Sequence, residues 1–156
     1  MSSYIPFESL QNIPLSYASC SIGTKESDTL PRKLEAIAAA GFTAIELSFP
    51  DILTYGSQIT GRELGSREYG QLVNVTKEIK KLVDSNGLRV MMLQPFGNFE
   101  GWPGGSRERE DALRRADGWM DIMEAAGTDL LQVPFPLSSA IYTHTDLKKK
   151  KIIIKN

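Results

Sequence analysis

Cysteine and histidine are almost absent from this sequence, which contains one of each, Cys20 and His144. A single cysteine excludes an internal disulfide framework and a cysteine-based zinc module. A single histidine excludes a metal site built from several histidines, and it leaves little support for a Ser-His-Asp triad. The chemistry of this chain therefore has to come from carboxylates, amides, hydroxyls and aromatic rings.

An excess of one charge and a long apolar run are also absent. Eighteen Lys and Arg residues face nineteen Asp and Glu residues, and this balance argues against nucleic acid or an anionic membrane as a partner. No apolar stretch reaches the length of a transmembrane helix, and residues 1–8 do not form a secretory signal. With 156 residues, 41% hydrophobic and 24% charged, we expect one cytoplasmic globular domain.

Glycines divide the chain into repeated strand and helix units. Apolar runs predict strands over residues 15–21, 43–49, 88–94 and 129–133. Helical spacing predicts helices before Gly41, Gly87 and Gly127, the last two of them beginning at Ser66 and Ser106. This alternation predicts the α/β class with a parallel sheet.

Further expectations follow from the pattern. The apolar strands predict a sheet buried on both faces. Leu113, Ala116, Met120 and Met123 are expected to form the inner side of the third helix. Long loops over residues 22–29, 50–65 and 95–105 follow the strands, at the carboxyl ends where such folds place their sites.

The remaining segments do not continue this pattern. Residues 1–12 are interpreted as an N-terminal extension, 13–133 as the domain, and 134–156 as an aberrant or disordered tail. The tail ends in KKKKIIIKN, whose low complexity suggests intron or frameshift read-through. The alternative is a solvated basic tail.

Four blocks of sequence carry a family resemblance: IPLSYASCSIGT (13–24), LEAIAAAGFTAIELSFPD (34–51), KLVDSNGLRVMMLQPFGNFEGWPGG (81–105) and WMDIMEAAGTDLLQV (119–133). They resemble the xylose isomerase-like TIM-barrel family, and within it the fungal sugar phosphate isomerase/epimerase branch that includes 3-dehydroshikimate dehydratases. The resemblance implies a (β/α)₈ barrel, of which this chain would hold about the first four βα units, a half-barrel.

The resemblance also implies a divalent metal, Mn, Mg or Co, at the carboxyl ends of the strands. Its ligands in the family lie mainly on second-half strands that have no counterpart here. His144 matches no family position, so no metal ligand is assigned and the metal is not expected to bind this chain.

Polar side chains at strand ends are the candidate substrate-binding residues. Glu46 lies in an apolar strand, where a carboxylate is costly unless it is paired or used. Gln94 ends the next strand, and its amide both donates and accepts, which suits a polyhydroxylated ligand. For Glu46 the alternative is a structural carboxylate satisfied by a backbone donor or an arginine.

The weaker candidates lie on the next loop and strand. Phe96, Asn98 and Trp102 follow Gln94, and Gln132 would face the same end by strand alternation. The aromatic rings could instead simply cover the barrel end. Cys20 is expected to be a buried structural thiol, and GWPGGS (101–106) is expected to be a helix-capping turn rather than a phosphate loop.

Two functions remain open. In the first, the protein is a metal-dependent isomerase, epimerase or dehydratase acting on a small hydroxylated carbonyl compound, with its catalytic residues unknown. In the second, the chain is a truncated, non-catalytic half-barrel that self-associates through open sheet edges. A small nucleotide-binding domain is disfavoured because SIGTKES, after the first strand, holds one glycine.

Overall fold

The computed structural model describes residues 13–23 and 25–134. Its elements follow in the order β1 (Ser16–Ala18), η1 (Ser19–Ser21), α2 (Leu30–Ala39), β2 (Ala44–Ser48), α3 (Phe49–Thr60), α4 (Tyr69–Ser85), β3 (Arg89–Gln94) and α5 (Arg107–Ala126). The strands are shorter than the apolar runs predicted, since the first run turns into the 3₁₀ helix η1 at Ser19.

The three strands form one parallel sheet in the order β1-β2-β3. The predicted strand at 129–133 is present only as a parallel bridge between Leu93 and Leu131. Backbone hydrogen bonds extend it, because Leu93 N–H donates to the Leu130 carbonyl and Gln132 N–H donates to the Leu93 carbonyl, each over 3.0 Å. The predicted α/β class with parallel strands is confirmed.

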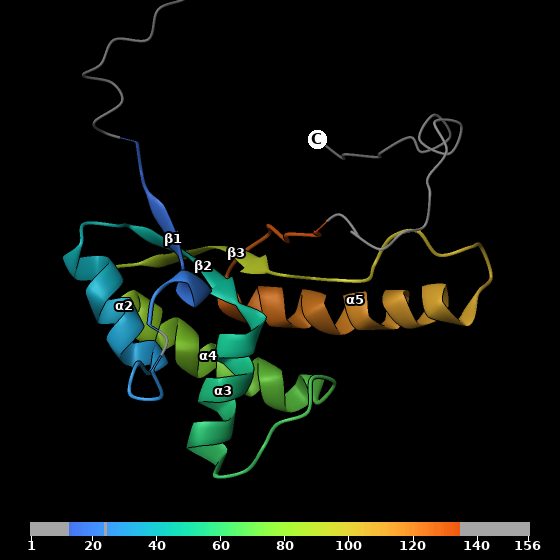
Figure 1. The fold of residues 1–156 in the computed structure, drawn as a ribbon, viewed down its shortest axis with the longest axis horizontal. Coiled ribbons are helices and arrows are strands. Elements are labelled where there is room, and N and C mark those ends of the chain that lie inside the picture. Colours follow the sequence, from blue (N-terminus) through green and yellow to red (C-terminus); the bar gives the residue numbers. More distant parts are fainter. Residues whose placement is uncertain (1–12, 24, 135–156) are drawn as a thin grey trace, which may run out of the picture.

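Helices α2, α3, α4 and α5 lie on one side of the sheet, below the strands in Figure 1. Ile45, Leu47 and Leu93 point to that side and are fully buried among residues of α2, α3, α4 and α5. On the opposite face, the side chains of Glu46 and Met92 are half-buried. None of the described α-helices lies over this second face, although Ala44, Ser48 and Gln94 on it are buried. The expectation of a sheet buried on both faces therefore holds for these residues and fails at Glu46 and Met92.

A β-bulge separates two segments of the ladder between β2 and β3. Ile45 pairs with Val90, whereas Glu46 pairs with Met92, so that Met91 is the extra residue on β3. The hydroxyl of Thr128 donates to the Met91 carbonyl over 2.8 Å. The bulge lets Val90 and Leu93, three residues apart, both face the helices, and it brings Gln94 level with Ser48.

A helix occupies most of the segment that the sequence predicted as a loop over residues 50–65. Helix α3 begins at Phe49, with Pro50 in its first turn, where a missing N–H costs nothing. Gly56 lies against α4, since a Cβ there would stand 2.5 Å from Leu64 Cδ1 and 3.1 Å from Val75. Proline and glycine, read as loop signals, here serve helix initiation and close helix packing.

Helix α5 presents a different side to the core from the one that the sequence predicts. Leu113 and Met120 are 50% and 47% exposed, whereas Trp119 and Ile122 are buried. The ring of Trp119 stacks on Phe49 at 4.4 Å between centroids and packs on Phe96 at 4.8 Å. These aromatic contacts set the rotation of α5, so only Met123 and Ala116 of the predicted inner side contact the core.

The helix boundaries agree with the predicted capping signals more closely than the buried side of α5 agrees with its prediction. Ser106 caps α5 by accepting a hydrogen bond from Arg109 N–H over 3.2 Å, which confirms the predicted capping turn. Helix α4 begins after Glu68 rather than at Ser66. The Glu68 carboxylate accepts hydrogen bonds from Gly65 N–H and from Arg62, and so closes the turn before α4.

Candidate functional site

Two of the predicted residues meet at the carboxyl ends of the strands. Gln94 Nε2 donates to Glu46 Oε2 over 3.3 Å. Gln94 is 9% exposed and Glu46 is half-buried, both on the face that none of the described α-helices covers. The amide therefore orients the carboxylate at the edge of the sheet where parallel α/β folds place their sites.

Cys20 joins this pair from η1. Its Sγ atom accepts from Gln94 Nε2 over 3.7 Å, so one amide group serves both the thiol and the carboxylate. Cys20 is exposed, and the expectation of a buried structural thiol is wrong. The physical reason is that the chain leaves the strand at Ser19, which turns Cys20 toward the open face.

The loop that follows β3 is held from the helix side. After the cis peptide bond between Gln94 and Pro95, the Phe96 ring is 1% exposed and packs in the core. The Arg115 guanidinium lies 5.0 Å from the centre of that ring and donates to the carbonyls of Gly97 and Asn98 over 3.0 and 2.7 Å. The structure thus places Phe96 in the core, and not on the face that carries Glu46.

Asn98 and Trp102 lie on the outer part of this loop. Asn98 adopts a φ of 56°, a left-handed conformation that asparagine tolerates well, and its carbonyl also accepts from Trp102 Nε1 over 3.0 Å. Both residues line a cleft of about 490 Å³, together with Arg67, Arg107, Glu108, Asp111 and Arg115.

Two of the arginines that line this cleft, Arg67 and Arg115, are paired with Asp111. Arg67 donates two hydrogen bonds to Asp111, over 2.6 and 2.9 Å, and they hold the pKa of that carboxyl below its ordinary value. Burial raises the pKa of the neighbouring Tyr69 hydroxyl. Gln132, the last predicted residue, is exposed, and its carbonyl accepts from Phe96 N–H over 2.9 Å.

Comparison with known proteins identifies the protein family of this chain. Residues 34–150 match the family described as xylose isomerase-like TIM barrel, which is most of the chain. The chain belongs to this family. The predicted family resemblance and the TIM-barrel type of fold are thereby confirmed, with the sheet and its helices forming part of such a barrel.

Relatives of known name point to one type of enzyme within this family. A 3-dehydroshikimate dehydratase of Pseudomonas aeruginosa is 37% identical over 108 residues, which is 69% of this chain and 14% of that protein. A 3-dehydroshikimate dehydratase of Neurospora crassa is 28% identical over 110 residues, 68% of this chain and 30% of that protein. The chain therefore spans less than a third of the length of these relatives.

A solved structure agrees with this assignment. It is titled a xylose isomerase-like TIM barrel/4-hydroxyphenylpyruvate dioxygenase fusion protein, and it superposes with a TM-score of 0.57 at 32% identity. The superposition covers 76% of this chain and 15% of that one. The family match reaches residue 150, past the start of the proposed tail; residues 135–156, with His144, lie outside the described residues, as do residues 1–12.

Within this family the resemblance implies a divalent metal, and the residues of the site can be tested for it. Glu46 contributes one carboxylate, beside the amide of Gln94 and the thiol of Cys20. Over residues 13–23 and 25–134 no group of three His, Cys, Asp or Glu side chains is arranged to hold a metal ion. The site as described does not fit a metal, so no ligand is assigned to it.

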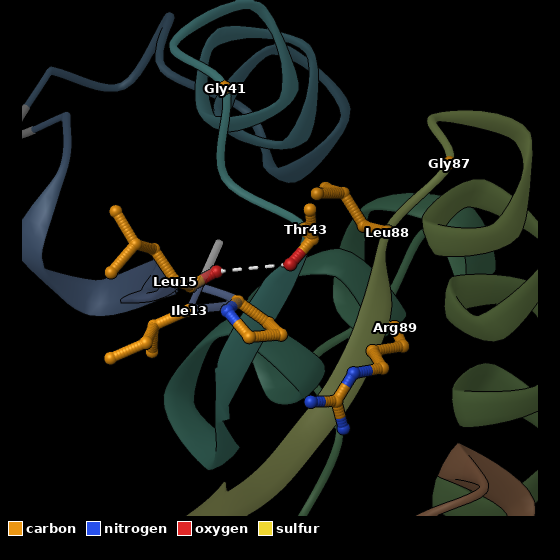
Figure 2. A pocket seen from close by; sticks show the side chains of 8 residues that line it. Ile13, Leu15, Gly41, Thr43, Gly87, Leu88 and Arg89 are labelled. Carbon is orange, nitrogen blue, oxygen red and sulfur yellow. Dashed lines mark hydrogen bonds between the residues drawn. The ribbon is translucent and has the colours of Figure 1, made fainter. Parts of the chain in front are cut away.

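A second hollow lies at the other end of the strands. It has a volume of about 560 Å³ and is lined by residues before and at the start of β1, β2 and β3, among them Leu15, Thr43 and Arg89. Figure 2 shows Thr43 Oγ1 donating to the Leu15 carbonyl across this opening, over 3.5 Å. In TIM barrels this amino end serves stability and the carboxyl end serves function.

A largely buried polar cluster near the site was not predicted from the sequence. Ser19 Oγ donates to Asp51 Oδ2 over 2.6 Å, and Lys33 Nζ donates to Asp51 Oδ1 over 2.8 Å. The available signal was Asp51 directly after Pro50, a residue pair typical of a first helical turn. Because the sequence pattern predicts a loop over residues 50–65, it does not predict this cluster.

Proposed function

We propose that this chain carries the substrate-facing part of a 3-dehydroshikimate dehydratase-like enzyme that acts on a small hydroxylated carbonyl compound. The observation that supports it most directly is the hydrogen bond of 3.3 Å between Gln94 and Glu46 on the open face of the sheet. The relatives named 3-dehydroshikimate dehydratase supply the reaction class.

The chemistry of the pair suits such a ligand. The Glu46 carboxylate accepts hydrogen bonds from ligand hydroxyls, and the Gln94 amide can offer its carbonyl oxygen as a further acceptor. In a dehydration of this type, a proton leaves the carbon beside the carbonyl and the β-hydroxyl departs, so that one water is lost overall. We assign binding and orientation of the ligand to Glu46 and Gln94, and no proton transfer.

A divalent metal enters this proposal only through the family. When bound, such an ion would polarise the ligand carbonyl. The described residues do not fit it, and the steps assigned above do not use it. A cytoplasmic location and the fungal-type branch also belong to the proposal; the structure itself shows that none of the described helices could span a membrane.

Binding of 3-dehydroshikimate, followed by ¹H–¹⁵N NMR of the isotopically labelled chain, tests this proposal. We expect amide shifts around Gln94 at the carboxyl ends of β2 and β3. Glu46→Gln, which keeps the size but removes the charge, and Gln94→Ala should weaken binding several-fold. Arg89→Ala, at the amino-end hollow, is the matched control and should bind as the parent does.

Two results would contradict the proposal. One is an absence of shifts up to millimolar ligand. The other is a set of shifts confined to the amino-end hollow and lost in Arg89→Ala, which would place any ligand at the opposite end of the sheet from Glu46.

A second candidate function is self-association as a half-barrel. Leu113 and Met120 of α5, seven residues apart and therefore on one side of the helix, are about half exposed, as is Leu130 beside β3. Two copies of this chain could cover these apolar side chains of α5 against each other, as exposed apolar surface favours association. We take a second copy as the partner in this proposal.

Sedimentation velocity over a range of concentrations tests the second candidate. A dimer should form and should be lost in the double variant Leu113→Lys with Met120→Lys. Ile59→Lys on α3, at a residue that is also 49% exposed, is the control and should leave the dimer intact. A monomer at every concentration would exclude this function.

A further inference from the structure

A cluster of three polar side chains joins η1 to two helices beside the site. The Asp51 carboxylate, in the first turn of α3, accepts from Ser19 Oγ on one oxygen and from Lys33 Nζ of α2 on the other. Ser19 is fully buried, and the Lys33 and Asp51 side chains are each 12% exposed. The cluster is therefore largely, but not completely, shielded from bulk water.

Ser19 is also fixed to the sheet. Its Oγ atom accepts from the backbone N–H of Ser48, the last residue of β2, over 3.0 Å. One hydroxyl thus ties η1 to the end of a strand and to the start of the following helix. Ser19 both donates and accepts here, so its orientation is determined by its partners.

Stability alone does not explain an ion pair that is largely shielded from water. Removing Lys33 and Asp51 from water costs free energy that their attraction only partly returns, and an apolar pair could fill the same space. What an apolar pair could not supply is an acceptor for the Ser19 hydroxyl. The arrangement is therefore better explained by the position that it gives to η1.

The position of η1 determines the position of Cys20, the residue after Ser19. Cys20 Sγ lies 3.7 Å from Gln94 Nε2, which in turn lies 3.3 Å from Glu46 Oε2. A shift of η1 would move the thiol away from the amide that orients the carboxylate.

We propose that Asp51 is a positioning residue that, through Ser19 and Lys33, holds η1 so that Cys20 stands against the Gln94–Glu46 pair. Its importance for substrate rests on the proposed function, whereas the positioning of Cys20 does not. The two can be tested apart, because Cys20 is the only cysteine in the sequence and reports on its own surroundings.

The experiment measures the rate at which iodoacetamide alkylates Cys20 in the folded chain, by intact-mass spectrometry. Asp51→Asn keeps the shape of the side chain and removes its charge, and Ser19→Ala removes the link to η1 while retaining the ion pair. We expect a several-fold change in the alkylation rate in both, since the freed η1 moves the thiol away from the Gln94 amide and the Glu46 carboxylate. Asp84→Asn, which breaks the exposed pair with Lys80, is the control and should alkylate at the parental rate.

Melting temperatures of all four proteins separate positioning from general stability. A changed alkylation rate in Ser19→Ala at a parental melting temperature, in either direction, supports the proposal even if Asp51→Asn fails to fold. An unchanged rate in Ser19→Ala, or an equal change in Asp84→Asn, overturns it. Protection of Cys20 by 3-dehydroshikimate in the parent chain reports on the proposed function separately, and its absence would leave the rate differences intact.

Discussion

The two faces of the β1-β2-β3 sheet differ in what covers them. On the face toward the helices, Ile45, Leu47 and Leu93 are fully buried and form a closed apolar core. On the other face, Glu46 and Met92 remain half-buried beside Gln94. Stability is therefore concentrated on one face and polar chemistry on the other, and substitutions on the two faces should affect different measurements.

The largest effect should come from a pair of truncations on adjacent strands. Leu47→Ala leaves a cavity in the core and should lower the free energy of unfolding by about 2–5 kcal/mol. Met92→Ala, on the open face, should cost about 1 kcal/mol, because much of its side chain already contacts water. Urea denaturation of both variants measures the difference, and equal costs would show that the open face is covered in solution.

A smaller effect is expected where the loop after β3 is held. Arg115→Ala removes two hydrogen bonds to the carbonyls of Gly97 and Asn98 and the contact with the Phe96 ring. We expect a loss of about 1–3 kcal/mol by the same urea measurement. Its neighbour Arg114, with a side chain 66% exposed, is the control, and Arg114→Ala should change little. Similar losses in both variants would contradict the role given to Arg115.

The turn before α4 lies away from both faces of the sheet, and its contribution to stability should depend on pH. Hydrogen bonds from Arg62 and from Gly65 N–H lower the pKa of Glu68 from 4.5 to about 2. Since the folded pKa is the lower one, the contribution of Glu68 is present above pH 4.5 and is lost as the pH falls toward 2.

Melting temperatures of the parent and Glu68→Gln at low salt measure this contribution. The parent should be slightly more stable at neutral pH, and the two should converge between pH 4.5 and 2. Glu63→Gln, an exposed neighbour, is the control. A constant difference between parent and Glu68→Gln over that range would contradict the assignment.

The smallest effect concerns the metal of the family. Because the described part of the open face brings no three ligands together, Mn²⁺ should leave the melting temperature of this chain unchanged. A rise of several degrees would show that the chain holds a metal, and it would contradict the half-barrel alternative. The rise should then be tested for its dependence on Glu46.

Local signals predicted most of the elements correctly. Apolar runs and glycine stops located β2, β3, α2, α4 and α5. They failed at α3, where Pro50 and Gly56 indicate a loop in isolation, but one starts the helix and the other allows it to approach α4. That packing is a tertiary property, which a local pattern does not contain.

The candidate site was predicted only in part, because some of its features also depend on tertiary contacts. Glu46 and Gln94 are polar residues at strand ends, so topology alone brought them together. The exposure of Cys20 depends on the turn at Ser19, and the burial of Phe96 depends on Trp119 and Arg115 from a distant helix. Their roles in binding substrate stay predictions, as do those of Asn98, Trp102 and Gln132.

The bulge at Met91 has a consequence for insertions and deletions during evolution. Deletion of one residue from β2 would move every residue on one side of the deletion to the opposite face of the sheet, since successive side chains alternate. Either Glu46 or Leu47 would then point to the wrong face. Loss of Met91 would restore a regular ladder and leave Leu93 and Gln94 on their present faces. Strand β3 therefore contains a position at which homologous chains can differ in length by one residue without rearranging either the core or the site.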